Sequence, residues 1–457
     1  MSSVPDEPMP TPAKRSHGAS ALRFWIVTHF EPIPTETEAR PMRAGLLARR
    51  LVDRGHEVVW WTPDFDHYHK RHRTGGDACI RVAAGFEVRL LESLGYRSHV
   101  GPRRLLHHEL LAARWRRAVG GRPPPDLVFA GWPTPEFASS AVSFARRKGI
   151  ASVVDVRDLW PDLWLDRMPS PIRPLGRIAL GRYDRMANRA MAGADAILGV
   201  TDDYVDWGVR RAGRPRRPDD RAFAFRYRAP EPSAAELARA EARLADMGFA
   251  RDERLTLVFA GAFGRTYGLE IALEAGRILD REAPDLVRIA LLGSGDRWEA
   301  IARAARSIRS VTVLPRVGVA ELSAAYRRAD LGLAPYLDID NFRRNLPNKI
   351  DEYLGAGLPI VAGVGGAIGR LIDEHGVGVR YGADDPASLA RTAMELARDP
   401  ERRSTLRVRV ERHRSSVLVS DEISGLAEHL EHLARRHIDG ASATRGERRS
   451  VPRPPTG

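Results

Sequence analysis

Apolar runs of strand length alternate with amphipathic runs of helix length along this chain, and the alternation occurs twice. The first series lies at residues 22–28, 57–62, 126–130, 151–156 and 196–200. The second series lies at residues 255–260, 287–292, 311–315, 331–335, 359–362 and 377–380. Strands separated by helices pair in parallel and are covered on both faces, so the pattern predicts an α/β protein with two Rossmann-like domains.

The length of 457 residues also favours two domains, because a single hydrophobic core rarely grows beyond about 250–300 residues. We expect an N-terminal domain at residues 22–228, a linker at 229–253, a C-terminal domain at 254–419 and a final helix at 420–437. Residues 1–21 and 438–457 lack apolar periodicity, so we expect disordered tails there. Open parallel sheets bind ligands beyond the carboxyl ends of their strands, so two such edges facing each other would enclose a cleft.

The amino-acid composition limits the cellular location and the binding partners that we expect for this protein. No stretch approaches the roughly 18 consecutive apolar residues of a membrane span, and the first residues lack the apolar segment of a signal peptide. The single cysteine, Cys79, fits a reducing compartment, and burial as a small apolar side chain is its other interpretation. We therefore expect a cytoplasmic protein. Its 72 Lys and Arg against 59 Asp and Glu give a net charge of +13, which attracts nucleic acid, anionic lipid or nucleotide sugars.

The most informative segment runs over residues 345–362 and reads NLPNKIDEYLGAGLPIVA. It resembles the donor-site segment of glycosyltransferase family 4, enzymes of the GT-B type, in which a short helix leads through a small-residue turn into an apolar strand. The resemblance places Glu352 where the second Glu of that family's Glu-x7-Glu pair holds the donor ribose, whereas Arg344 stands at the first position. A carboxylate suits this task because it accepts two hydroxyl protons at once.

Lys349 lies three residues before Glu352 on nearly the same helical face, where its charge could reach the donor diphosphate. Asn348 precedes it and is a further donor-side candidate. The alternative is that Lys349 and Glu352 are solvent-facing residues of an ordinary helix.

A second segment, residues 259–272, reads FAGAFGRTYGLEIA and resembles the family's first strand-loop-helix of the C-terminal domain. Glycines there let backbone amides approach a phosphate at a helix start, although they also make ordinary turns. Ala262 and Tyr267 stand where family members often carry Arg and Lys, so Arg265 is expected to supply the charge. The donor-binding glycines are expected to be Gly261, Gly264, Gly293, Gly295, Gly365 and Gly366.

In the N-terminal half, residues 154–163 read VDVRDLWPDL and are similar to a segment of family members that build bacterial surface polysaccharides. Asp158 could orient or deprotonate an acceptor hydroxyl, and Arg157 could meet an acceptor phosphate; equally, the two could form an ion pair that ends a strand. Upstream, residues 29–43 resemble the family's opening loop without its usual glycines, so His29 and Arg43 are the acceptor-side candidates there.

A basic amphipathic helix is predicted at residues 103–117, with Leu106, Leu110 and Ala113 on one face. Such a helix lies on anionic lipid or, as is more common, packs its apolar face on its own domain. The first alternative would suit a polyprenyl-phosphate acceptor carried in a bilayer.

Sequence motifs for a metal or a covalent nucleophile are absent: there is no cysteine pair, no His-Glu-x-x-His and no Gly-x-Ser-x-Gly. We therefore expect a cofactor-free, metal-independent reaction. Without a metal, cationic side chains and helix-start amides must stabilise the leaving diphosphate. The expected catalytic residues are Asp158, Arg265 and Lys349.

The resemblance covers nearly all of residues 22–437 and implies a retaining hexosyltransferase or related enzyme. Its C-terminal domain would bind a UDP- or GDP-sugar rather than nucleic acid, its N-terminal domain would bind a glycan or polyprenyl-linked acceptor, and its final helix would cross back onto the N-terminal domain. A role in surface polysaccharide or glycolipid biosynthesis follows, in the cytoplasm or peripherally on the inner face of the membrane. The alternatives are a nucleotide-sugar 2-epimerase of the same fold and a noncatalytic nucleotide-sugar-binding subunit.

Overall fold

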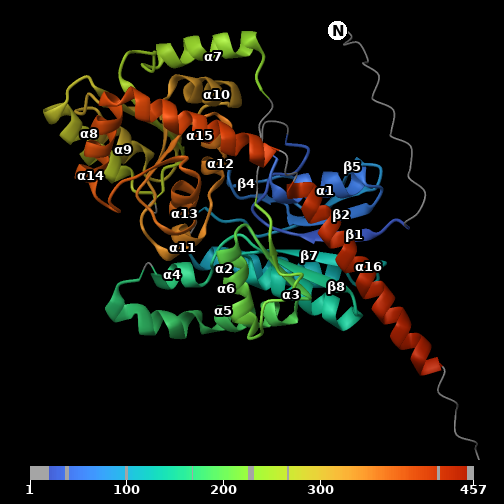
Figure 1. The fold of residues 1–457 in the computed structure, drawn as a ribbon. Coiled ribbons are helices and arrows are strands. Elements are labelled where there is room, and N and C mark those ends of the chain that lie inside the picture. The colour runs from blue at the N-terminus through green and yellow to red at the C-terminus, as the bar shows by residue number, and fades with distance from the viewer. Residues whose placement is uncertain are drawn as a thin grey trace, which may run out of the picture.

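The computed structural model describes residues 20–36, 41–97, 101–166, 168–224, 231–264, 267–418 and 422–449. It contains two large sheets, each flanked by helices (Figure 1). The expected α/β class is confirmed, and both series of strands that the sequence predicts are present.

The first sheet has eight strands in the order β10-β9-β8-β7-β1-β2-β6-β5. Its strands are β1 (Arg23–Val27), β2 (Glu57–Pro63), β5 (Ala78–Ala83), β6 (Phe86–Leu91), β7 (Leu127–Trp132), β8 (Ala151–Val156), β9 (Ala196–Gly199) and β10 (Arg221–Ala222). All neighbours pair in parallel except β5 and β6, which form an antiparallel hairpin at one edge. The short strands β3 (Phe65–Asp66) and β4 (Arg71–His72) pair separately.

Helices cover both faces of this sheet, because the strands are buried throughout and alternate residues point to opposite sides. One face is covered by α2 (Pro102–Ala118), α3 (Pro135–Lys148), α5 (Arg173–Gly193) and α6 (Asp202–Ala212). The other face is covered by α1 (Arg43–Asp53) and by α16 (Glu422–Arg449), which comes from the end of the chain. The short α4 (Asp162–Asp166) and a 3-10 turn (Ser170–Ile172) lead into α5.

The second sheet has six parallel strands in the order β13-β12-β11-β14-β15-β16. They are β11 (Leu255–Ala262), β12 (Val287–Ser294), β13 (Val311–Pro315), β14 (Leu331–Ala334), β15 (Ile360–Ala362) and β16 (Gly378–Arg380). The chain reverses its direction of travel across the sheet between β11 and β14. Such a switch point leaves a crevice at the carboxyl ends of the two strands, where open α/β sheets bind ligands.

The helices of this half are α7 (Ala234–Asp246), α8 (Leu269–Glu282), α9 (Trp298–Ala305), α10 (Val319–Arg328), α11 (Asp340–Arg344), α12 (Asn348–Gly355), α13 (Gly366–His375), α14 (Pro386–Arg398) and α15 (Pro400–Leu418). Helices α8, α9 and α14 bury one face of the sheet, and α7, α10, α11, α12 and α13 bury the other; α15 contributes Leu406 to the first side and Val410 to the second.

Helix α7 corrects the expectation of a linker at residues 229–253. Its Ala240 and Leu244 are buried in the same cluster as strand residues Val258 and Ala290, so the helix belongs to the packing of the second sheet. A capping box formed by Ser233 and Glu236 starts the helix. The preceding Arg- and Pro-rich loop had obscured this local helical pattern.

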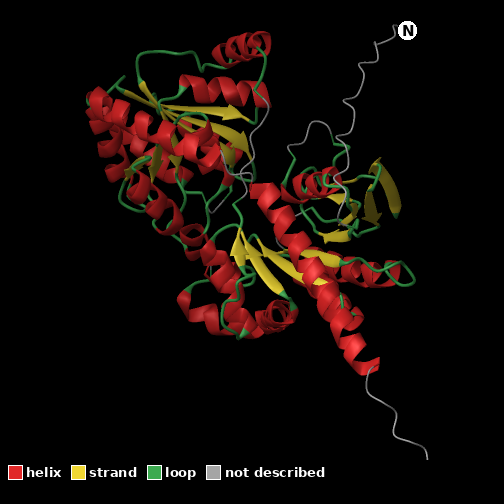
Figure 2. Cartoon of the chain, turned by 45° about the vertical axis from the view of Figure 1, so that its right-hand side comes forward, coloured by secondary structure: helices red, strands yellow, loops and turns green. Residues whose placement is uncertain are grey.

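Helix α16 packs on the first sheet although it follows the second in sequence (Figure 2). Leu426, Leu430 and Leu433 are buried with Phe24 and Leu47 in one cluster. The helix continues to Arg449, so the disordered tail expected from residue 438 is corrected for residues 438–449. Within the residues described, no helix combines the length and the apolarity needed to cross a bilayer.

The carboxyl edges of the two sheets face each other. The Thr201 hydroxyl, just after β9, donates to the Arg344 carbonyl of α11 at 2.6 Å, and the Tyr204 hydroxyl donates to Asn341 Oδ1 at 3.0 Å. Arg370 of α13 also pairs with Asp203. Because α11 and α13 follow β14 and β15, the loops at the carboxyl ends of both sheets meet at this junction.

Candidate active site

The second sheet holds a lysine-glutamate pair at its switch point. Lys349 and Glu352 lie one turn apart on α12, and Lys349 Nζ is 3.0 Å from Glu352 Oε2. The Tyr326 hydroxyl donates to the same carboxylate oxygen at 2.9 Å. Glu352 is only 12% exposed, so it is not the solvent-facing residue of the alternative interpretation. Two donors fix the orientation of its carboxylate.

Lys349 reaches over the end of β11. A side chain added at Gly261 would place its Cβ 3.5 Å from Lys349 Cε, which puts the lysine stem beside the last residues of that strand. Asn348 is the first residue of α12 and is half-buried. The structure therefore brings together Gly261, Asn348, Lys349 and Glu352, four of the residues predicted for the donor site.

Two of the predicted glycines allow the ends of β11 and β12 to approach closely. A Cβ at Gly293 would lie 1.9 Å from the Gly261 carbonyl oxygen, and Gly295 has φ +149° with the Phe263 backbone 2.7 Å from its Cβ position. Gly264 differs, because the nearest atoms among the described residues would be those of the Tyr267 ring at 3.6 Å, an ordinary contact. Arg265 lies outside the described residues, so its predicted role stays a prediction.

The loop before α13 contains the remaining two predicted glycines. Gly366 has φ +65°, and a Cβ there would lie 1.8 Å from the Arg343 carbonyl oxygen. Asp338 faces this loop: Arg343 donates to its two carboxylate oxygens at 2.7 and 2.6 Å. Arg343 and, secondarily, the Gly365 amide lower the pKa of Asp338. The amide-lined start of α13 thus already faces an anion, which is the property that a phosphate site requires.

Arg344 occupies the position of the family's first glutamate. Its Nε lies 2.9 Å from an Asp340 carboxylate oxygen one turn earlier. Its carbonyl receives the Thr201 hydrogen bond, so this residue belongs to the junction between the two sheets.

In the first domain, Arg43 is buried, and each nitrogen of its guanidinium donates a hydrogen bond. Its guanidinium donates to both Asp155 oxygens at 2.9 Å and to the Phe223 carbonyl at 2.7 Å, and its side chain is 3% exposed. Although burial alone would raise the pKa of Asp155, Arg43 and Arg157 hold it below its ordinary value. Arg43 is therefore part of the interior, in contrast to the acceptor contact that the sequence predicted for it.

Arg157 shares this network and lies closer to the surface. It donates to Asp155 Oδ2 at 2.6 Å and pairs with Glu31, whose other oxygen accepts the Ala44 amide at 2.8 Å. Its third nitrogen, NH2, has no hydrogen-bond partner among the described residues. Of the two alternatives for Arg157, an ion pair at the strand end is present, but its partners are Glu31 and Asp155.

Asp158 follows β8, and its carboxylate accepts the Leu159 amide at 2.8 Å. Burial raises the pKa of Tyr267, and the charge of Asp158 raises it further. Tyr267 follows β11 and forms a bridge with Tyr336, which follows β14. The carboxylate thus acts across the junction on residues at the switch point of the second sheet, where the donor candidates lie.

His29 lies in a buried cluster that the sequence did not predict. Its ring centroid is 5.1 Å from that of His107 and 5.3 Å from that of His108, and its nitrogens have no hydrogen-bond partner among the described residues. Burial, reinforced by neighbouring histidines, lowers the pKa of His29, and burial lowers that of His107 to about 3. These imidazoles are neutral at physiological pH.

Glu136 completes this cluster. His108 Nδ1 is 3.7 Å from Glu136 Oε2, and burial raises the pKa of this carboxyl to about 7. Glu136 is the second residue of α3, directly beyond β7. The adjacent histidines in a basic helix were the available signal, but only the fold shows that they meet His29 and Glu136.

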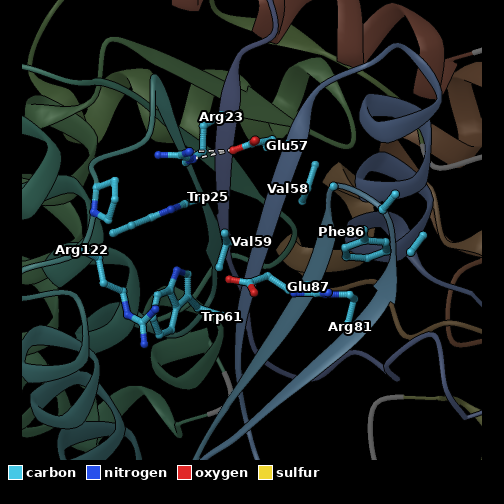
Figure 3. Close-up of a pocket in the computed structure, with 14 residues that line it drawn as sticks. Arg23, Trp25, Glu57, Val58, Val59, Trp61, Arg81, Phe86, Glu87 and Arg122 are labelled. Carbon is cyan, nitrogen blue, oxygen red and sulfur yellow. Dashed lines mark hydrogen bonds and ion pairs between the residues drawn. The ribbon is translucent and has the colours of Figure 1, made fainter.

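Two further features bear on the location of the site. The described part of the chain holds no group of three or more His, Cys, Asp or Glu side chains placed to bind a metal ion. A cavity of about 420 Å³ lies beside the amino-terminal ends of β1, β2 and β6, where Arg122 stacks near Trp61 and Arg23 pairs with Glu57 (Figure 3). It is at the opposite edge of the first sheet from Asp158 and is separate from the candidate site.

Two Rossmann-type sheets with their carboxyl edges facing each other, tied by a C-terminal helix, define the class of GT-B glycosyltransferases. Residues 254–399 match the family model described as Glycosyl transferases group 1, and residues 42–220 match the model described as Glycosyl transferase 4-like domain. Both matches support a glycosyltransferase of the family 4 type, as the motifs predict.

A curated relative is D-inositol 3-phosphate glycosyltransferase of Salinispora arenicola, 30% identical over 219 residues. This alignment spans 48% of the present chain and 42% of the relative, less than half of the relative's length.

Solved structures with the same fold include sucrose-phosphate synthase from Thermosynechococcus elongatus, with a TM-score of 0.65, 16% identity and coverage of 92% of this chain and 100% of that one. Anabaena HepE in complex with UDP-glucose has a TM-score of 0.56, 14% identity and coverage of 92% and 100%. An Escherichia coli trehalose-6-phosphate structure bound with UDP-2-fluoro glucose has a TM-score of 0.62, 13% identity and coverage of 90% and 99%.

Proposed function

We propose that this protein transfers a glycosyl group from a nucleotide diphosphate sugar to an acceptor hydroxyl. The observation that carries the proposal is the Glu352 carboxylate, oriented by Lys349 and Tyr326 beside the end of β11. A fixed acceptor of hydrogen bonds next to a lysine ammonium, at the switch point of a parallel sheet, suits a ribose followed by a diphosphate.

The proposed donor is a UDP-sugar, with a GDP-sugar as the second choice. Support for UDP comes from the structural neighbours, since HepE and the E. coli structure were solved with UDP-sugars. Lys349, Arg265 and the amides at Gly365 and Gly366 would stabilise the charge on the leaving diphosphate without a metal ion. The glycines at 261, 264, 293 and 295 would let the backbone pass close to the donor.

The proposed acceptor is a glycan or a polyprenyl-linked sugar. Asp158 would orient the acceptor hydroxyl or take up its proton, while Arg157 and His29 line the same edge of the first domain. The acceptor oxygen then bonds to the anomeric carbon as the bond from that carbon to the diphosphate breaks, and the nucleoside diphosphate leaves. We propose retention of configuration and a role in surface polysaccharide or glycolipid synthesis, at the inner face of the membrane.

The test is to incubate the full-length protein with a panel of nucleotide sugars, with and without membrane lipid extract. Release of nucleoside diphosphate only with extract, and undiminished by EDTA, is the expected result. Isomerised donor would identify a 2-epimerase, and tight nucleotide binding without turnover would identify a binding subunit. Loss of turnover with EDTA would contradict the metal-independent mechanism.

A further inference from the structure

Large exposed apolar side chains gather on two helices of the first domain. Ten such residues occur in the described part of the chain, and half of them lie on α2, on α5 or at the turn that leads into α5. They are Leu106, Leu110, Ile172, Leu175 and Ile178. Ile178 is 79% exposed and Leu175 is 68% exposed, which is unusual for side chains of this size.

An ion pair links the two helices. Arg182 of α5 pairs with Glu109 of α2, and both helices pack on α3. Leu106 lies one turn before Glu109, and Ile178 lies one turn before Arg182, so both belong to the faces that meet at this ion pair. We call the surface formed by Leu106, Leu110, Ile172, Leu175 and Ile178 the α2–α5 surface.

The amino-terminal half of α5 is held in place with its apolar side chains outward. A Cβ at Gly176 would overlap the Met168 sulfur at 2.2 Å and approach Leu165 at 3.2 Å, so this helix face packs closely on the preceding segment. Residues 173–175 and 177–179 around it are exposed. In Figure 1, α5 lies along the lower edge of the molecule, away from the second domain.

The same helices are strongly basic. Together α2 and α5 carry ten arginines against two acidic residues, Glu109 and Asp184. Both acidic residues form ion pairs: Glu109 pairs with Arg182, and Asp184 lies 3.0 Å from Arg211. An apolar centre within a basic surround is complementary to a bilayer that presents anionic headgroups above acyl chains.

We propose that the α2–α5 surface docks this protein on an anionic lipid bilayer. Ile172, Leu175, Ile178, Leu106 and Leu110 enter the headgroup region, and the arginines around them contact lipid phosphates. The proposal rests on the proposed function, since it supplies a route for a lipid-linked acceptor. Helix α2 also leads to the candidate site: Arg104 lies over the Phe30 ring at 5.1 Å and within electrostatic range of Asp158.

The test is flotation of the purified full-length protein with vesicles. One set contains phosphatidylcholine mixed with phosphatidylglycerol, and the other contains phosphatidylcholine alone. The native protein is expected to float with the anionic vesicles, less so as salt is raised. The double variant Leu175→Ser/Ile178→Ser is expected to lose at least about tenfold in affinity, because two exposed side chains no longer insert.

The matched control is Val319→Ser/Val408→Ser, which removes two exposed apolar side chains of the second domain, 52% and 57% exposed. It should bind anionic vesicles like the native protein. Equal flotation of the Leu175→Ser/Ile178→Ser variant, or native binding that does not distinguish the two vesicle sets, would overturn the proposal. So would a change from dimer to monomer in that variant with unchanged flotation, which would assign the surface to a second copy of the chain.

Nucleotide binding separates this proposal from the proposed function. The thermal shift caused by UDP should be the same in the native protein and in Leu175→Ser/Ile178→Ser, because both residues lie on α5 of the first domain, whereas Glu352 and Lys349 lie on α12 of the second. A normal UDP shift with lost flotation supports the docking surface. Flotation that depends on Leu175 and Ile178 in a protein that binds no nucleotide would retain the surface and remove the proposed donor.

Discussion

At the scale of single residues, the contacts of Glu352 decide what it can do. A carboxylate on a short helix normally rotates freely in water, but here a tyrosine and a lysine hold one of its oxygens. The other oxygen keeps the orientation that these bonds impose. Pre-orientation of this kind lowers the entropy lost when a ligand binds.

We predict that Glu352→Ala and Lys349→Ala each abolish the rise in unfolding temperature caused by UDP, because a ligand stabilises the native state according to its affinity. Tyr326→Phe should keep a reduced shift, since it removes one hydrogen bond worth about 1 kcal/mol. Thermal shift at several UDP concentrations measures this. Glu274→Ala, an exposed ion-pair residue on α8, is the control, and an unchanged response in both Glu352 and Lys349 variants would move the donor site elsewhere.

Glu136 gives a prediction about pH. Its pKa is raised to about 7 by burial, so between its unfolded value of 4.5 and pH 7 the folded protein holds a proton that the unfolded chain releases. Stability is therefore lost as the pH rises through this window, by on the order of 1–3 kcal/mol. Glu136→Gln, which mimics the protonated acid, should match the native protein at pH 5 and unfold at a higher temperature at pH 8.

Buried histidines act in the opposite direction, because their lowered pKa values make the folded protein lose stability as the pH falls below 6.5. The difference between native protein and Glu136→Gln at each pH cancels their contribution. A difference that does not grow between pH 5 and pH 8 would show that Glu136 is ionised in the fold.

The sequence indicated which donor-side candidates lie together better than it indicated the surroundings of the acceptor-side candidates, for a physical reason. Lys349 and Glu352 belong to one helix, where a spacing of three places side chains on one face. Arg43 and Asp155 are 112 residues apart in sequence, so no local pattern could show that they form a buried ion pair. His29, His107 and Glu136 likewise meet only through the order of β1, β7 and α2 in the fold.

At the scale of elements, the ends of β11 and β12 pack so closely that no side chain fits between their backbones. We predict that Gly293→Ala costs roughly 2–4 kcal/mol of stability and weakens UDP binding, because its Cβ would overlap the Gly261 carbonyl of the neighbouring strand. Gly264→Ala is the matched variant in the adjoining loop, where no described residue would lie closer than 3.6 Å to the new Cβ, and it should retain the native stability. Urea unfolding of both variants tests this, and equal losses would show that the two strand ends can separate.

Parallel strands were predictable because they are buried on both faces and appear as continuous apolar runs. The β5–β6 hairpin was missed, since β5 alternates exposed and half-buried residues at the edge of the sheet and carries a weaker signal. Helix α7 was missed because its pattern of Leu237, Ala240 and Leu244 follows a long segment without periodicity. Local sequence patterns thus predicted the central strands. The peripheral hairpin and helix α7 could be identified only from the tertiary contacts.

At the scale of the whole molecule, α16 returns the end of the chain to the first domain. Arg54 and His56 of the first domain pair with Glu431, and Arg436 pairs with Asp219, around the buried leucines of this helix. The helix therefore contributes both apolar packing and ion pairs to a domain that ends some 200 residues earlier in the chain.

We predict that Leu430→Ala, at a fully buried position, lowers the stability of the first domain by about 2–5 kcal/mol through lost burial and the cavity left behind. Eight of the nine tryptophans lie in residues 22–228, so tryptophan fluorescence during denaturation reports on this domain. The exposed neighbour His432→Ala should be neutral. Equal midpoints for native protein and Leu430→Ala would mean that the helix is only loosely attached.

The position of α16 also affects the order of events during synthesis. Residues 22–51 leave the ribosome early, yet the apolar surface they form with β7 and β8 is completed only by residues 426–434. That surface must stay open while the whole second domain is translated, so the nascent first domain offers a binding site for chaperones until the last helix arrives.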